Sequence, residues 1–152
     1  MKGLLLSFAL FISLNAFSQI KLPKSFKHIN QDFHVGSAYT DGTYRISIYP
    51  FGHDGVELDD IIKSVDKLST QKYMHTKDNL YIFTGKEDDM YYYKILLPES
   101  LFQLQVRSKV NDKKFSYYSE WLLKEVRDKR NKPCKYPDGY IYLTDWTGKE
   151  EL

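Results

Sequence analysis

The chain has 152 residues, of which 22 are basic and 20 are acidic, and its formal net charge is +2 at neutral pH. This near balance of charge gives no support to a nucleic-acid-binding protein, which would carry a basic patch or stripe. The single cysteine, Cys134, excludes an intramolecular disulfide, so a folded domain must be held together by its core. We expect Cys134 to be an incidental thiol in a proline-rich loop.

The first 18 residues are typical of a secretory signal peptide. Lys2 precedes an apolar run over residues 4–12, and Ala16 and Ser18 supply the small residues that a signal peptidase requires. The run is too short to span a bilayer, so we expect cleavage after Ser18 and no stable membrane insertion afterwards. The product would be secreted or periplasmic, and its residues 19–152 are predicted to form a single globular domain.

The mature chain is predicted to begin with an irregular segment and a hairpin. Residues 19–31 have no clear hydrophobic period, so we expect a lead-in without regular structure. Asp41 and Gly42 then separate two strand-like segments, 33–40 and 43–49. This dipeptide is typical of a two-residue hairpin turn, in which both central residues take positive φ.

The predicted hairpin pairs Tyr39 with Tyr44. In the second strand Tyr44, Ile46 and Ile48 alternate with other residues, so we expect one face in the core and the other face mostly in water. Pro50 has no backbone N–H to donate and should end this strand.

A helix is predicted to follow Asp54 and to end near Gln71. Asp54 and Glu57 have the spacing of a capping box, in which each side chain accepts from a free amide at the helix start. The apolar residues that follow recur at steps of three and four, which predicts one buried stripe: Leu58, Ile61, Ile62, Val65 and Leu68.

The stretch from Lys72 to Ser108 is predicted to be an antiparallel meander. It contains four short apolar segments separated by turn residues: 72–76, 80–84, 90–97 and 101–108. The two middle segments are apolar or aromatic on both alternating rows, so we expect them to lie mid-sheet with both faces covered.

The last strand of the meander is predicted to have one wet face. Apolar and polar residues alternate in it with a period of two, which places Leu104 in the core and Gln105 in water. The two rows are Phe102, Leu104 and Val106, and Gln103, Gln105 and Arg107.

A second helix is expected over residues 116–130, followed by a turn and a last strand from Tyr140 to Trp146. We therefore predict an α+β fold in a single domain. Its antiparallel sheet would contain the N-terminal hairpin, the four-stranded meander and the C-terminal strand, with two helices packed on it, one on each face.

Two groups of residues are candidates for function. His53 and Asp54 lie in a loop between strand and helix, where an imidazole beside a carboxylate could act as a general base, although a helix cap already explains Asp54. Tyr140, Tyr142 and Trp146 share one row of the last strand, and if exposed they would form a stacking surface for a sugar or a peptide.

We expect an exported, soluble, non-catalytic binding domain for a protein or a glycan partner, because the chain contains none of the common catalytic motifs. Two alternatives stay open: a small periplasmic or extracellular hydrolase that uses His53 and Asp54, and an immunity-type protein that neutralises a toxin. No cofactor or metal is expected, and the pattern leaves the oligomeric state open.

Overall fold

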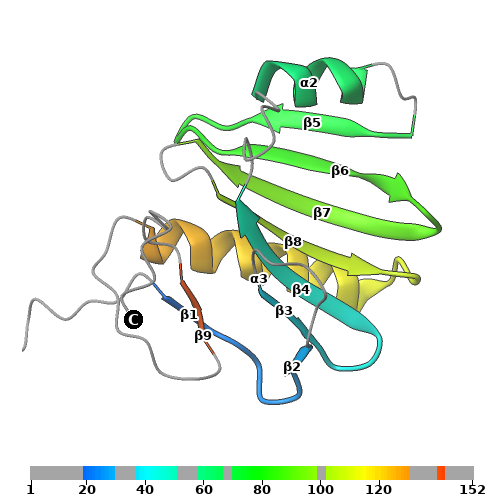
Figure 1. Cartoon of the computed structure of the whole chain (residues 1–152), viewed down its shortest axis with the longest axis vertical. Coiled ribbons are helices and arrows are strands. Elements are labelled where there is room, and N and C mark those ends of the chain that lie inside the picture. The colour runs from blue at the N-terminus through cyan, green and yellow to red at the C-terminus, as the bar shows by residue number, and fades with distance from the viewer. Residues whose placement is uncertain are drawn as a thin grey trace, which may run out of the picture.

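A computed structural model describes residues 19–29, 37–50, 58–66, 70–98, 102–130 and 140–142. These residues form a single α+β domain built on a seven-stranded antiparallel sheet with two helices, which confirms the predicted class (Figure 1). The spatial order is β2-β3-β4-β8-β7-β6-β5. Its strands are β2 (Lys27–Ile29), β3 (Ser37–Thr40), β4 (Tyr44–Pro50), β5 (Lys72–His75), β6 (Tyr81–Glu87), β7 (Met90–Leu97) and β8 (Phe102–Ser108).

The meander and the hairpin join through their long strands. Strands β5 to β8 follow one another in space as predicted, and β8 pairs along its whole length with β4 of the hairpin. Strand β6 runs further than expected, through Gly85 to Glu87. The turn that follows has only Asp88 and Asp89 between register partners, at φ 50° and 59°, which is the positive-φ geometry of a two-residue hairpin turn.

The hairpin turn between β3 and β4 is wider than predicted. Tyr39 pairs with Ile46 rather than with Tyr44. Asp41 Oδ1 accepts from the backbone N–H of Tyr44 at 2.9 Å, and Gly42 has φ 99°. The predicted two-residue turn is wrong because the Asp41 side chain closes the loop locally, as aspartate often does in turns.

Two further predictions about the sheet are wrong. The segment 19–31 contains strand β1 (Gln19–Lys21) as well as β2, and the C-terminal strand β9 (Tyr140–Tyr142) pairs with β1 in a separate two-stranded sheet. A three-residue strand is too short to show a period, so neither its existence nor its partner could be predicted from alternation. Ile20 explains why β1 is ordered, since its side chain is fully buried in the core.

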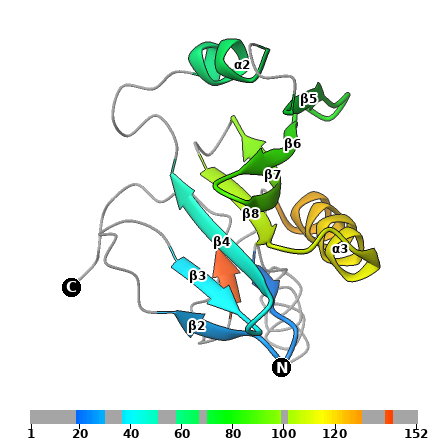
Figure 2. The same cartoon turned by 90° about the vertical axis from the view of Figure 1, so that its right-hand side faces the viewer.

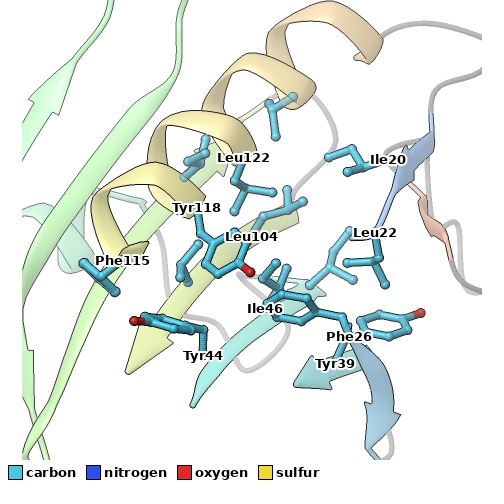
Figure 3. Close-up of a cluster of buried hydrophobic side chains, with 14 of the residues drawn as sticks. Ile20, Leu22, Phe26, Tyr39, Tyr44, Ile46, Leu104, Phe115, Tyr118 and Leu122 are labelled. Atoms are coloured by element: carbon cyan, nitrogen blue, oxygen red, sulfur yellow. The ribbon is translucent and has the colours of Figure 1, made fainter. Parts of the chain in front are cut away.

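The main core lies between the sheet and helix α3 (Lys113–Lys129). Asp112 caps the helix. The buried residues of α3 recur at steps of three and four, as in an amphipathic helix, and this side of the helix faces the sheet. Figure 3 shows Tyr118 and Leu122 of α3 pointing toward Leu104 and Ile46 of the sheet. The buried residues of this helix are Phe115, Tyr118, Ser119, Leu122 and Val126.

Helix α2 (Leu58–Asp66) belongs to a second, smaller cluster. It lies beyond the β5 edge of the sheet (Figures 1 and 2) and packs Leu58, Ile61 and Ile62 against three sheet residues, Phe83, Tyr92 and Leu96. The described helix agrees with the predicted apolar stripe as far as residue 62. The predicted cap at Asp54 lies outside the described ranges. The structure ends the helix at Asp66 and describes Gln71 as non-helical, which corrects the predicted end near Gln71.

The polar row of β8 does not face water, which corrects the prediction for this strand. Gln103 and Gln105 are buried, with 9% and 6% of their surface exposed, and Ser47 on β4 is buried as well. Gln105 Nε2 donates to Ser47 Oγ at 3.2 Å. Alternation predicted the two rows of β8 and β4 correctly, but it could not predict that the polar row is buried and hydrogen-bonded across strands.

Candidate ligand-binding groove

An open groove of about 480 Å³ lies between the start of α3 and the strands β6 and β7. We call it the tyrosine groove. Among its lining side chains are Tyr91 and Tyr93 of β7, Lys86 of β6, Lys72 of β5, and Ser116 and Glu120 of α3.

The bottom of the groove is aromatic. Tyr91 and Tyr93 lie on the same row of β7, are partly buried, and pack against the main core. Their register partners on β6 are Lys86 and Thr84. Lys86 Nζ lies 5.3 Å from the centroid of the Tyr91 ring, a cation–π distance. Burial raises the pKa of Tyr93, so its hydroxyl stays protonated and can donate a hydrogen bond at neutral pH.

The α3 wall of the groove is polar. Ser119 Oγ donates to the backbone oxygen of Phe115 at 2.9 Å and is therefore occupied within the helix. Ser116 and Glu120 are exposed at the rim. Glu120 forms no ion pair with any residue in the described ranges, so its carboxylate is free to accept hydrogen bonds from a ligand.

Asp112 fixes the N-terminal end of α3 over the sheet. Its Oδ1 accepts from the backbone N–H of Phe115 at 2.9 Å, and the Tyr44 hydroxyl donates to the same carboxylate at 2.7–2.8 Å. The hydrogen bond from Tyr44 lowers the pKa of Asp112, and the same bond raises the pKa of Tyr44 to about 12. An amide of the first helical turn and the hydroxyl of a strand residue thus donate to the same carboxylate.

The other end of α3 is held by Asp78 in the turn between β5 and β6. Its carboxylate accepts from Arg127 Nε at 2.9 Å, and its backbone oxygen accepts from Arg130 at 2.6 Å. The Arg127 hydrogen bond is the largest cause that lowers the pKa of Asp78, to about 2. With both ends of α3 anchored to the sheet, the wall of the groove has a defined position.

Gly85 is needed at the β6 side of the groove for close approach. A Cβ at this position would lie 2.9 Å from Tyr92 Oη, from the Thr70 backbone oxygen and from Gln71 Cγ. The Tyr92 ring lies on the strand position directly opposite Gly85, where the glycine leaves space for it.

The residues predicted to form sites are mostly outside the described ranges. Tyr140 and Tyr142 pair with Lys21 and Gln19 in the small sheet, but their side chains are not described, and Trp146 lies outside the described residues. His53, Asp54 and Cys134 also lie outside them. The aromatic binding row and the hydrolase alternative therefore stay predictions.

The tyrosine groove was missed because its two rings belong to a strand expected to be covered on both faces. The three consecutive tyrosines at 91–93 were the available signal: Tyr92 is buried on one row, whereas Tyr91 and Tyr93 keep part of their surface on the other. The position of the start of α3 over β7 decides this exposure, and periodicity contains no information on it.

Within the described part of the chain, no three His, Cys, Asp or Glu side chains converge on a position that could hold a metal ion. The helices found there are too short or too polar to cross a bilayer. Comparison with protein-family models, with curated proteins and with solved structures found no match.

Proposed function

We propose that this chain is an exported, non-catalytic binding domain that holds a short glycan in the tyrosine groove. The observation that carries the proposal is the pair Tyr91 and Tyr93, half-buried side by side at the bottom of an open groove with a polar rim. Sugar rings have apolar C–H faces that suit aromatic rings, and hydroxyls that suit groups such as Lys72, Lys86 and Glu120.

The size of the groove favours a small ligand over a folded partner. Its volume of about 480 Å³ lies within the range of ~300–1,000 Å³ typical of small-molecule sites. A protein partner would instead need roughly 800 Å² of complementary surface on each side. A short oligosaccharide is therefore a better fit to the groove than a folded protein.

The lining of the groove favours binding over catalysis. Hydrolysis of a glycosidic bond generally uses two carboxylates that flank the bond, and Glu120 is the one carboxylate in the described lining. The hydrolase alternative with His53 and Asp54 would have to use another part of the molecule. It predicts that His53→Ala abolishes a measurable hydrolytic activity.

Two further parts of the proposal are the placement of the two helices on opposite faces of the sheet and the export of the chain. The contacts of α2 with Phe83, Tyr92 and Leu96 support the inference that the two helices cover opposite faces of the sheet. Export is supported by the signal peptide predicted over residues 1–18.

The test is binding of the purified mature chain to a panel of immobilised oligosaccharides of two to six sugar units, followed by calorimetry with the one retained best. Tyr91→Ala should weaken binding about tenfold or more, which corresponds to ~1.4 kcal/mol. Glu120→Gln should also weaken it, because a hydrogen-bond acceptor of the rim loses its charge.

Tyr117→Ala is the matched control, because Tyr117 is an exposed tyrosine of α3 and does not line the groove. It should bind the same oligosaccharide with unchanged affinity. Retention of no oligosaccharide, or equal losses in Tyr91→Ala and Tyr117→Ala at unchanged thermal stability, would contradict the proposal.

A further inference from the structure

Three basic side chains gather on the sheet row that faces away from the α3 core. Arg45 on β4 and Arg107 on β8 are register partners, so they lie directly opposite one another. Lys94 on β7 is the register partner of Gln105, two residues before Arg107 on the same row. We call Arg45, Lys94 and Arg107 the basic cluster.

The basic cluster is electrostatically unfavourable by itself. Like charges directly opposite on neighbouring strands repel, and the partly buried surroundings screen them less than water would. Arg107 has only 25% of its side chain exposed. Burial lowers the pKa of Lys94, the Glu87 carboxylate partly offsets this, and the charge of Arg107 lowers it further. The fold thus places three cations together at a cost in stability.

The described residues supply one carboxylate to these three cations. Arg107 Nη2 lies 3.9 Å from Glu87 Oε2 and donates to the Glu87 backbone oxygen at 3.3 Å. The Glu87 side chain is 55% exposed and can move away. Nε of both arginines is buried and has no hydrogen-bond partner among the described residues. Buried donors of this kind normally have one, so the cluster has unused capacity for an anion.

We propose that the basic cluster binds an oxyanion group, a sulfate, phosphate or carboxylate of a small ligand. Each guanidinium group can donate a pair of parallel hydrogen bonds to such a group, and the Lys94 ammonium adds a third positive charge. Glu87 occupies part of this position when the oxyanion is absent. The site is separate from the tyrosine groove, because Tyr91 and Tyr93 lie on the opposite row of β7.

The test measures binding to the mature chain by calorimetry and thermal shift, with sodium sulfate, sodium phosphate and sodium glucuronate as probes. Sodium chloride at matched ionic strength is the reference, and the three probes distinguish the possible sources of the oxyanion. At least one probe should bind saturably and raise Tm above the chloride reference.

Four single variants decide the assignment. Arg45→Gln and Arg107→Gln should each raise the dissociation constant of the probe at least about tenfold, since a hydrogen bond to a charged group is lost. Glu87→Gln should lower this dissociation constant, because the competing carboxylate is removed. Lys124→Gln is the matched control: it removes one positive charge from the exposed side of α3, away from the cluster, and should leave the constant unchanged.

Stability without a probe gives an independent reading. Arg45→Gln should not lower Tm, because it relieves the repulsion with Arg107. The proposal is overturned if every probe acts like chloride at equal ionic strength, or if Arg45→Gln and Lys124→Gln bind equally well. Should Arg107→Gln fail to fold, the opposite changes in the dissociation constant expected for Arg45→Gln and Glu87→Gln still test the proposal.

Discussion

Asp78 is a single residue whose charge contributes to stability in a pH-dependent way. Its folded pKa of about 2 lies below the ordinary value of 3.8, so its contribution is fully present above about pH 4 and is lost as the pH falls through 2. The side chain is 36% exposed, which screens the ion pair with Arg127. Asp78→Asn should therefore destabilise by about 1 kcal/mol or less at pH 7.

Urea unfolding at pH 7, 4 and 2.5 measures this effect, and the difference between Asp78→Asn and the parent chain should shrink across the series. Asp88→Asn is the control, because Asp88 sits exposed in the β6–β7 turn at positive φ, which asparagine tolerates. A difference for Asp78→Asn that is the same at every pH would show that the ion pair is not its cause.

Strand β8 is the element where burial on both rows can be measured directly. Leu104→Ala should cost about 2–5 kcal/mol in the free energy of unfolding, since it empties a fully buried site. Gln105→Ala should cost about 1–3 kcal/mol, because Ser47 loses its partner inside the sheet. The exposed Lys109→Ala serves as the reference and should stay within about 0.5 kcal/mol.

Chemical denaturation of the three variants gives the comparison. If Gln105→Ala behaved like Lys109→Ala, the polar row of β8 would be solvated and its burial in the structure would be wrong. If Gln105→Ala instead stabilised the protein, the hydrogen bond to Ser47 would be weaker than the cost of burying the amide.

Elements long enough to show a hydrophobic period were predictable from sequence, and shorter elements were not. Alternation, turn residues and apolar stripes predict the four strands of the meander, the hairpin and both helices. Most of these elements have seven or more residues. Strands β1, β2 and β9 have three residues each, and their pairing depends on long-range contacts such as the burial of Ile20.

The same limit applies to the candidate sites. The tyrosine groove depends on how far α3 covers β7. The basic cluster depends on the register of β4, β7 and β8, of which β4 is far from the other two along the chain. The spacings between Arg45, Lys94 and Arg107 in the sequence follow no strand or helix period. Only the pairing of β4 with β8, and of β8 with β7, brings them onto one row.

At the scale of the whole molecule, the first prediction to test is the export of the chain and the cleavage of its signal peptide. We expect secretion in a native host to yield a product that begins at Gln19, because Ala16 and Ser18 place small residues correctly behind the apolar run. Intact-mass measurement of the exported protein checks the cleavage site. A product that keeps residues 1–18 in the membrane fraction would contradict the proposed soluble export.

The last prediction concerns the aromatic row of Tyr140, Tyr142 and Trp146, which is a second candidate surface for the same class of ligand. Rigid aromatic faces bring a large contact area at low entropic cost, as the hot spots of interfaces do. If the row is a binding surface, Trp146→Ala and Tyr142→Ala should each weaken partner binding by at least about 2 kcal/mol and leave Tm nearly unchanged. Calorimetry and thermal unfolding of both variants, beside Tyr91→Ala, measure the two quantities. A large fall in Tm would instead assign the row to a core, and the tyrosine groove would remain as the binding surface.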